Sequence, residues 1–202
     1  MTLPSPVPLG APLPSPTPSQ ELLTRLAVRR SAPAQALSAP GPDTDQITDI
    51  LTLAARSPDH GKLTPWRFVV MGPLNRAEIA EKLAVMAVAK GLPSKATAVL
   101  AKLTAAPTTV LVISTAAPAS KPVWEQQLSA GAVCMNLEHA ASAFGFASSW
   151  ITDWYSYDAE AVALFGVRDG EKVAGFIHLG TATEPLLERD RPDVAAITTT
   201  LP

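Results

Sequence analysis

The run from Ala55 to Val70, ARSPDHGKLTPWRFVV, joins a cationic loop to an apolar strand. Pro58 and Gly61 prevent the loop from continuing the preceding helix. Arg56 and His60 supply hydrogen-bond donors within the loop. A polar loop that is fixed at a strand is a common way of holding donors beside a ligand. The run therefore predicts a ligand-binding loop, and the alternative is an ordinary surface loop with a structural tryptophan.

Two guanidinium groups and a hydroxyl, those of Arg29, Arg30 and Ser31, follow an amphipathic helix expected over residues 20–28. A guanidinium can hold a phosphate through two charge-assisted hydrogen bonds, and a hydroxyl adds a neutral donor. The motif is short, and a solvated helix end is its alternative interpretation. Together with the downstream loop, it predicts a site for a phosphorylated planar cofactor.

Helical and strand patterns alternate along the rest of the chain. Asp43 and Gln46 have the spacing of a capping box at the start of a second helix. Small residues fill a long helix expected over residues 123–144, which favours close helix contact. Other helices are expected over 75–90, 94–104 and 158–165, and strands over 66–71, 108–115, 148–151 and 172–179. We expect an α+β fold of four or five strands with helices around them.

The first eighteen residues are rich in proline and contain neither lysine nor arginine. They lack the positive start and apolar middle of a secretory signal. We expect a disordered, Pro-rich leader over residues 1–18 and a single domain over residues 19–202.

Composition excludes several classes of function. The formal net charge is −2 and the signs are interspersed, so the basic field that nucleic-acid binding needs is missing. No stretch reaches the roughly 18 consecutive apolar residues of a membrane span. A lone Cys134 allows no internal disulfide, which favours a reducing cytoplasm. The apolar fraction of 47% indicates that part of the surface meets another subunit.

Metal and nucleophile chemistry also find no support in the sequence. His60, His139 and His178 lie in three separate elements, and none has a second ligand at metal-binding spacing. The chain has no Gly-x-Ser-x-Gly elbow, and Cys134 lies in an apolar helical pattern. The glycine motifs that cradle nucleotides are missing as well, so arginines would have to hold a nucleotide phosphate.

Taken together, these motifs resemble the FMN-dependent nitroreductase family in its short, minimal branch. Arg29-Arg30-Ser31 and the loop before Pro65-Trp66 carry the resemblance first. Downstream segments then follow in the order of that branch: Trp124-Glu125-Gln126, Ser129-Ala130-Gly131-Ala132, Ala140-Ala141 to Phe144-Gly145-Phe146, Trp150-Ile151-Thr152, Tyr157-Asp158, and Val173-Ala174-Gly175-Phe176 to Leu179-Gly180-Thr181. The resemblance covers about residues 20 to 194.

The resemblance implies a homodimer with a mostly antiparallel sheet and FMN at the subunit interface. Four segments would touch FMN. Arg29-Arg30-Ser31 would grip the phosphate and ribityl chain, and Arg56 with His60 would lie on the flavin. Trp150-Ile151-Thr152 would come from the facing subunit, and Gly180-Thr181 would lie close by.

The chain departs from the family pattern at two positions. Thr64 stands where Gln or Asn is frequent, and Asp153 stands where Gly is common. The first change affects an amide contact to the flavin ring, and the second puts a charge near it. Arg189 and Arg191 resemble the family's basic tail.

The function implied is a ping-pong oxidoreductase, in which NADH or NADPH reduces FMN and a small-molecule acceptor is then reduced. Nitroaromatics, quinones or related conjugated compounds would be the acceptors, and no side chain need act as a nucleophile. Two alternatives stay open. One is a different flavin reduction, such as reductive dehalogenation or enoate reduction, and the other is a non-catalytic protein that stores or senses flavin.

Overall fold

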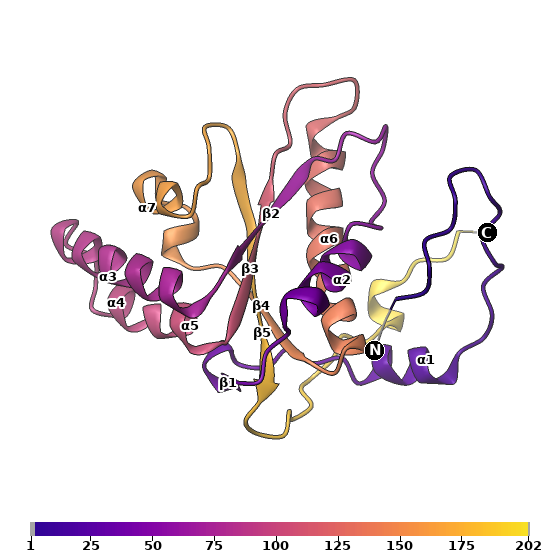
Figure 1. Ribbon diagram of the computed structural model, residues 1–202, viewed down its shortest axis with the longest axis horizontal. Helices are drawn as coiled ribbons and strands as arrows, with labels where there is room; N and C mark the ends of the chain where they lie inside the picture. Colours follow the sequence, from indigo (N-terminus) through magenta and orange to yellow (C-terminus); the bar gives the residue numbers. More distant parts are fainter. Residues whose placement is uncertain (1–2, 202) are drawn as a thin grey trace.

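The structure is a computed structural model that describes residues 3–201. An antiparallel sheet lies between two layers of helices, with α2 and α6 on one face and α3, α4, α5 and α7 on the other (Figure 1). The architecture confirms the expected α+β fold and the mostly antiparallel sheet of four to five strands flanked by helices.

The longest strand, β5 (Lys172–Ala182), pairs with three others. It lies between β3 (Thr108–Ser114) and β4 (Ala147–Ile151), and β2 (Trp66–Met71) pairs with β3 at the edge. All of these pairings are antiparallel. The fifth strand, β1 (Leu37–Ser38), pairs with the end of β5 and was missed by the sequence analysis.

Two helices cover the face of the sheet that will carry the site. They are α2 (Thr44–Ala54), with the expected capping box, and α6 (Val123–Ala143). Alternate strand residues point to this layer, because side chains along a strand alternate between the two faces. Val110, Val112 and Ile177 share one buried cluster with the inner faces of both helices.

The other face is covered by α3 (Pro73–Ala89), α4 (Lys95–Ala98), α5 (Leu100–Ala105) and α7 (Ala159–Leu164). The helix expected from residue 75 begins earlier because a proline is favoured at the first helical position, where its missing N–H is not needed. The single helix expected over 94–104 is two short helices that meet at Val99. The 3₁₀ turns are Ala34–Ala36, Trp154–Ser156 and Ala195–Ile197.

The first helix, α1 (Gln20–Ala27), follows the N-cap Ser19 close to the expected bounds and buries none of its residues. Residues 3–18 form no helix or strand, and nearly all of them are exposed. Within residues 3–201, no helix is both long enough and apolar enough to span a membrane.

Candidate functional site

The segment Arg29–Ser31 follows α1 and lies near α6 and the start of β4. The backbone N–H of Ala32 donates to the carbonyl of Ser148 at 2.9 Å, which anchors the segment to β4. Arg29 Nη1 donates to the Ser31 hydroxyl at 3.3 Å and lies 3.9 Å from the Glu138 carboxylate on α6. Because Arg30 Nη1 also donates to the backbone carbonyl of Ser31, both arginines are hydrogen-bonded to Ser31, and the three residues form a local cluster.

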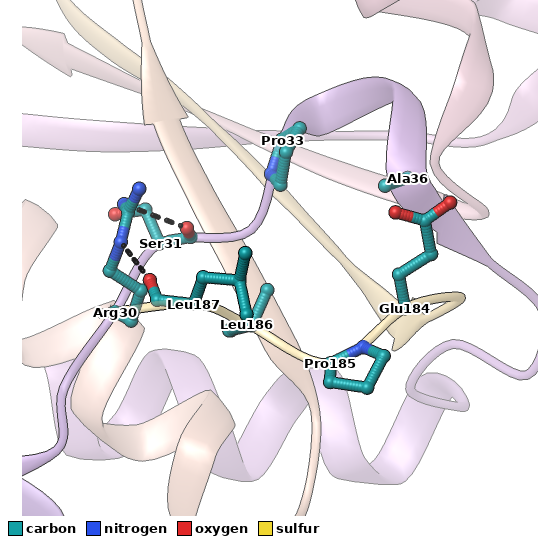
Figure 2. Close-up of a pocket in the computed structure, with 8 residues that line it drawn as sticks. All are labelled: Arg30, Ser31, Pro33, Ala36, Glu184, Pro185, Leu186 and Leu187. Carbon is teal, nitrogen blue, oxygen red and sulfur yellow. Dashed lines mark hydrogen bonds between the residues drawn. The ribbon is translucent and has the colours of Figure 1, made fainter. Parts of the chain in front are cut away.

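Arg30 borders a small pocket that the C-terminal segment closes (Figure 2). Its Nε donates to the carbonyl of Leu187 at 3.1 Å, and its Nη1 donates to the carbonyl of Ser31 at 3.2 Å. The pocket has a volume of about 220 Å³. Arg30 keeps further N–H donors that these two bonds do not use, because a guanidinium carries five. The residues that line it are Arg30, Ser31, Pro33, Ala36, Glu184, Pro185, Leu186 and Leu187.

The C-terminal segment also holds the backbone of the motif. Arg191 Nη2 donates to the carbonyl of Arg29 at 3.0 Å and to the Glu188 carboxylate at 2.8 Å. Arg191, which resembles the basic tail of the family, thus lies beside the arginine motif.

The loop after α2 is fastened to α6 by side-chain hydrogen bonds. Asn136 Nδ2 donates to the Ser57 hydroxyl at 2.9 Å, and Ser129 donates to the carbonyl of Pro58 at 2.6 Å. Trp66 Nε1 donates to the same Ser129 hydroxyl at 3.2 Å. The entry and exit of the loop are therefore fixed to one helix.

The two predicted flavin contacts both lie in this loop, Arg56 at its start and His60 nearer its tip. His60 Nδ1 lies 2.5 Å from Glu125 Oε2 on α6, and both side chains are exposed to solvent. Arg56 is exposed and its guanidinium has no hydrogen bond within residues 3–201. Thr64 has a φ of 47°, a value that few residues other than glycine adopt, and its N–H donates to the Asp59 carboxylate at 2.7 Å. That bond holds the tip in its unusual conformation.

The segment at the end of β4 divides its side chains between the two faces of the sheet. Trp150 lies half-exposed over Gly175, and its Nε1 donates to the carbonyl of Ala174 at 3.1 Å. A Cβ atom at Gly175 would lie only 2.0 Å from that Nε1, so the indole occupies the space of a side chain. Ile151 instead packs against the core on the far face. Trp150 is the more available of the two for a ligand.

Thr152 and Asp153 complete this segment. The Thr152 hydroxyl accepts a hydrogen bond from Tyr157 at 2.8 Å. The Asp153 carboxylate caps the following 3₁₀ turn and lies 3.3 Å from Lys102 Nζ. The charge at Asp153 therefore has structural partners of its own.

Gly180 and Thr181 lie near the end of β5, where Gly180 pairs with Ala147 of β4 and Thr181 pairs with Ser38 of β1. Gly180 is buried, and a Cβ there would come within 2.8 Å of the Ser38 carbonyl oxygen. The glycine is thus required by the close approach of β1. Thr181 is exposed and donates to the carbonyl of Pro40 at 2.8 Å.

The arginine segment and the loop lie on opposite sides of α6. Arg29 meets α6 at Glu138, whereas Ser57 meets it at Asn136, and residues two apart on an α-helix are separated by about 200° around its axis. Between the two sides runs an outward face of α6. That face carries two exposed apolar side chains, those of Trp124 and Leu128.

Titratable groups in the core of this region are held uncharged or paired. Burial, together with the Glu138 carboxylate one turn away, raises the pKa of the Cys134 thiol to about 12. A thiol in that state is not a nucleophile at neutral pH. Within residues 3–201 no group of three or more His, Cys, Asp or Glu side chains could hold a metal ion.

Comparison with known proteins adds to this geometry. Residues 26–181 match the family model described as the Nitroreductase family. The chain belongs to this family. A relative from Haemophilus influenzae, described as "Putative NAD(P)H nitroreductase", is 35% identical over 168 residues, which cover 81% of this chain and 90% of the relative. A relative from Escherichia coli K12 with a similar description is 34% identical over 166 residues, 80% of this chain and 88% of the relative. These relatives support an oxidoreductase.

Solved structures that are similar to this nitroreductase-family chain support the fold. A nitroreductase-like protein from Bacillus cereus has a TM-score of 0.77 at 16% identity, covering 93% of this chain and 99% of its own. A nitroreductase from Bacteroides fragilis, solved with bound FMN, has a TM-score of 0.71 at 25% identity and covers 90% of this chain and 100% of its own.

One residue of the site was missed by the sequence analysis. Glu138 is buried on α6, accepts a hydrogen bond from the Ser148 hydroxyl at 3.0 Å, and faces Arg29. The available signal was an acidic residue in line with the buried apolar positions of α6. A buried carboxylate needs a partner.

Proposed function

We propose that the chain is an FMN-dependent oxidoreductase that acts as a homodimer. Its hydride donor is NADH or NADPH, and its acceptors are nitroaromatics, quinones or related conjugated compounds. Donor and acceptor occupy the same place in turn, which gives ping-pong kinetics. We place the protein in the cytoplasm, because its one cysteine is buried and unpaired.

The cluster of Arg29, Arg30 and Ser31 carries this proposal. Arg30 and Ser31 line the pocket, and Arg29 is hydrogen-bonded to the Ser31 hydroxyl, an arrangement that suits a phosphate group. Family membership and the FMN-bound relative from Bacteroides fragilis agree with that chemistry. The residues present therefore fit the phosphate end of FMN.

The rest of the cofactor needs more surface than one chain offers at this cluster. Sites for ligands of this size typically have volumes of roughly 300–1,000 Å³. The pocket at Arg30 has about 220 Å³. A second copy seated on the outward face of α6, where Trp124 and Leu128 are exposed, would border both sides of the helix. This supports the homodimer, in which the segment Trp150-Ile151-Thr152 would reach the cofactor of the partner with the exposed Trp150 foremost, since the Ile151 side chain packs in the core.

When bound, FMN supplies the acceptance and donation of hydride. Arg29, Arg30 and Ser31 bind its phosphate and ribityl chain and set its direction. Arg56 and His60 face its ring from the fastened loop, and the contact of His60 with Glu125 fixes the imidazole. Gly180 and Thr181 shape the backbone beside the cluster. Binding and orientation are thus the protein's contribution, and no side chain acts as a nucleophile.

The experiment that tests the proposal is anaerobic reduction of the FMN-loaded protein. NADPH and then NADH are added while the visible absorption of the flavin is followed. Bleaching by either donor, followed by recovery on addition of a nitroaromatic or a quinone, is the expected result. Stable binding without bleaching would replace the enzyme with a flavin-storage or sensing protein. Failure to bind FMN would contradict the proposal altogether.

Acceptor screening separates the remaining alternatives. A reduced protein that is reoxidised by halogenated aromatics or by enoates, and not by nitroaromatics or quinones, would catalyse reductive dehalogenation or enoate reduction instead.

A further inference from the structure

Glu138 is a buried carboxylate that neither the fold nor the proposed chemistry requires. Its side chain is 4% exposed on the inward side of α6. Taking a carboxylate out of water is costly unless it is paired and hydrogen-bonded, and an apolar side chain would pack as well at such a position. The presence of a charge here therefore calls for a purpose beyond packing.

The partners of Glu138 connect it to the arginine cluster. Oε1 accepts the hydrogen bond from the Ser148 hydroxyl on β4 at 3.0 Å, and Oε2 lies 3.9 Å from Arg29 Nη1. The same Nη1 donates to the Ser31 hydroxyl at 3.3 Å. A continuous polar chain thus runs from the core of the molecule to two of the three groups that are proposed to hold the phosphate.

We propose that Glu138 is a positioning residue that holds Arg29 ready for the phosphate of the cofactor. The inference rests on the proposed function and deepens it, because it names the feature that makes the site favour a phosphorylated flavin. An arginine side chain that is free in solution loses rotamer freedom when it binds a ligand. Glu138 limits the rotamers of Arg29 before the ligand arrives. Less conformational entropy is then lost on binding, and the affinity for the ligand is higher.

The position of Arg29 agrees with this role. Its side chain is one-third exposed, with one Nη atom turned to the buried carboxylate. A guanidinium carries five N–H donors in a planar fork, so a carboxylate behind it leaves donors on the other edge for an anion. Glu138 therefore orients the fork without occupying all of it.

The test compares binding of FMN with binding of riboflavin, which has the same ring and ribityl chain and no phosphate. Apoprotein is titrated with each flavin, and quenching of flavin fluorescence gives the two dissociation constants. Glu138→Gln keeps the shape of the side chain and an oxygen for Ser148, and removes the charge that faces Arg29. We expect FMN affinity to fall roughly threefold to tenfold, with riboflavin affinity unchanged within about twofold.

Two controls make the result specific. Glu81→Gln, an exposed residue of α3 on the far side of the sheet, changes the net charge equally and should leave both constants unchanged. In an Arg29→Ala background, Glu138→Gln should have no further effect on FMN affinity, because a residue that acts through Arg29 has nothing left to position.

Several outcomes would overturn the inference. Equal weakening of FMN and riboflavin would show a general structural defect. Unchanged or tighter FMN binding in Glu138→Gln would show that the carboxylate does not help the clamp, and a full effect in the Arg29→Ala background would show that it acts by another route. If Glu138→Gln does not fold, Ser148→Ala, which removes only the hydroxyl donor, must show the same FMN-specific loss at smaller size. An unsubstituted chain that binds neither flavin would overturn the proposed function and this inference together.

Discussion

The two faces of the sheet use polar residues in different ways. On the α6 face, polar side chains lie at the margins: Arg29 and Glu138 at one side of the helix, and Ser57 and Asn136 at the other. On the opposite face, an aromatic cluster fills the centre, and Tyr155 and Phe176 have ring centroids 5.3 Å apart. Two side chains with polar groups, those of Arg76 and Tyr155, are fully buried on that face.

The buried guanidinium of Arg76 on α3 shows the difference most clearly. It donates to the carbonyls of Leu103 and Ala106 at the end of α5 and to the carbonyl of Gly72, and has no carboxylate partner within residues 3–201. Burial lowers its pKa to about 10. Arg29 and Arg30 keep partial exposure and unused donors. Arg29 and Arg30 are therefore available to a ligand, whereas Arg76 stabilises the fold by bonding to backbone carbonyls.

The largest expected effect tests the structural side of this comparison. Arg76→Ala leaves a cavity and removes the donors of three carbonyls, so the free energy of unfolding should fall by about 3 kcal/mol. Urea denaturation measures the change. Arg168→Ala, an exposed arginine, should stay within about 0.5 kcal/mol of the unsubstituted chain. The division between faces would be wrong if Arg76→Ala left stability intact and weakened FMN binding.

The next effect tests the ligand side. Arg30→Ala removes charge-assisted hydrogen bonds to a phosphate, each worth about 1.5–3 kcal/mol, so FMN affinity should fall roughly 10- to 100-fold. Stability should change by less than about 0.5 kcal/mol. Flavin fluorescence quenching gives the affinity.

Arg25→Ala is the matched control for Arg30→Ala. Arg25 lies in the last turn of α1 and donates to the carbonyl of Ser142 at 2.8 Å, outside the cluster. It should bind FMN as the unsubstituted chain does. An Arg30→Ala chain with full affinity for FMN would remove the phosphate role from this segment.

The smallest expected effect is the pH dependence of stability that the buried His178 causes. Burial, and then the nearby charge of Arg76, lowers the pKa of His178 to about 3. Between pH 6.5, the ordinary pKa of histidine, and about pH 3, His178 is protonated in the unfolded chain and neutral in the folded chain. The free energy of unfolding therefore falls as the pH falls through this range. From about pH 7 to pH 5 the loss is about 2 kcal/mol.

Urea denaturation at several pH values checks this slope, with His178→Asn as the control. Asn still offers a partner to Thr109, which now lies 2.8 Å from His178 Nδ1, and it does not titrate. The ion pair with Arg67 lowers the pKa of Glu171 to about 2, so that group loses its stabilising effect only below about pH 4.5 and does not obscure the window. Parallel slopes in both chains would assign the pH dependence to other groups.

Local signals in the sequence predicted much of the fold. The strand over residues 66–71 has the expected bounds because Pro65 and Gly72 punctuate it, and α2 begins where its capping box requires. The strand β1 has only two residues, and its partner is the distant end of β5, so no local pattern marks it. Its position depends on tertiary pairing alone.

The candidate site divides in the same way. Arg29, Arg30 and the loop around His60 were found because their residue types cluster in sequence, and their cofactor roles stay predictions. Glu138 was not found, because only the packing of α6 against the arginine segment gives its carboxylate a partner. The separation of the two clusters to opposite sides of α6 also depends on helix register.

The contact between Trp150 and Gly175 has a consequence for the history of the chain. The indole fills the volume that any side chain at position 175 would need. Substitutions at the two positions are therefore coupled: residue 175 is confined to glycine while tryptophan stands at 150, and is released when a smaller residue replaces it. In related sequences, residues 150 and 175 should therefore change together. A tryptophan at position 150, next to the proposed flavin, should be accompanied by glycine at position 175 on the neighbouring strand.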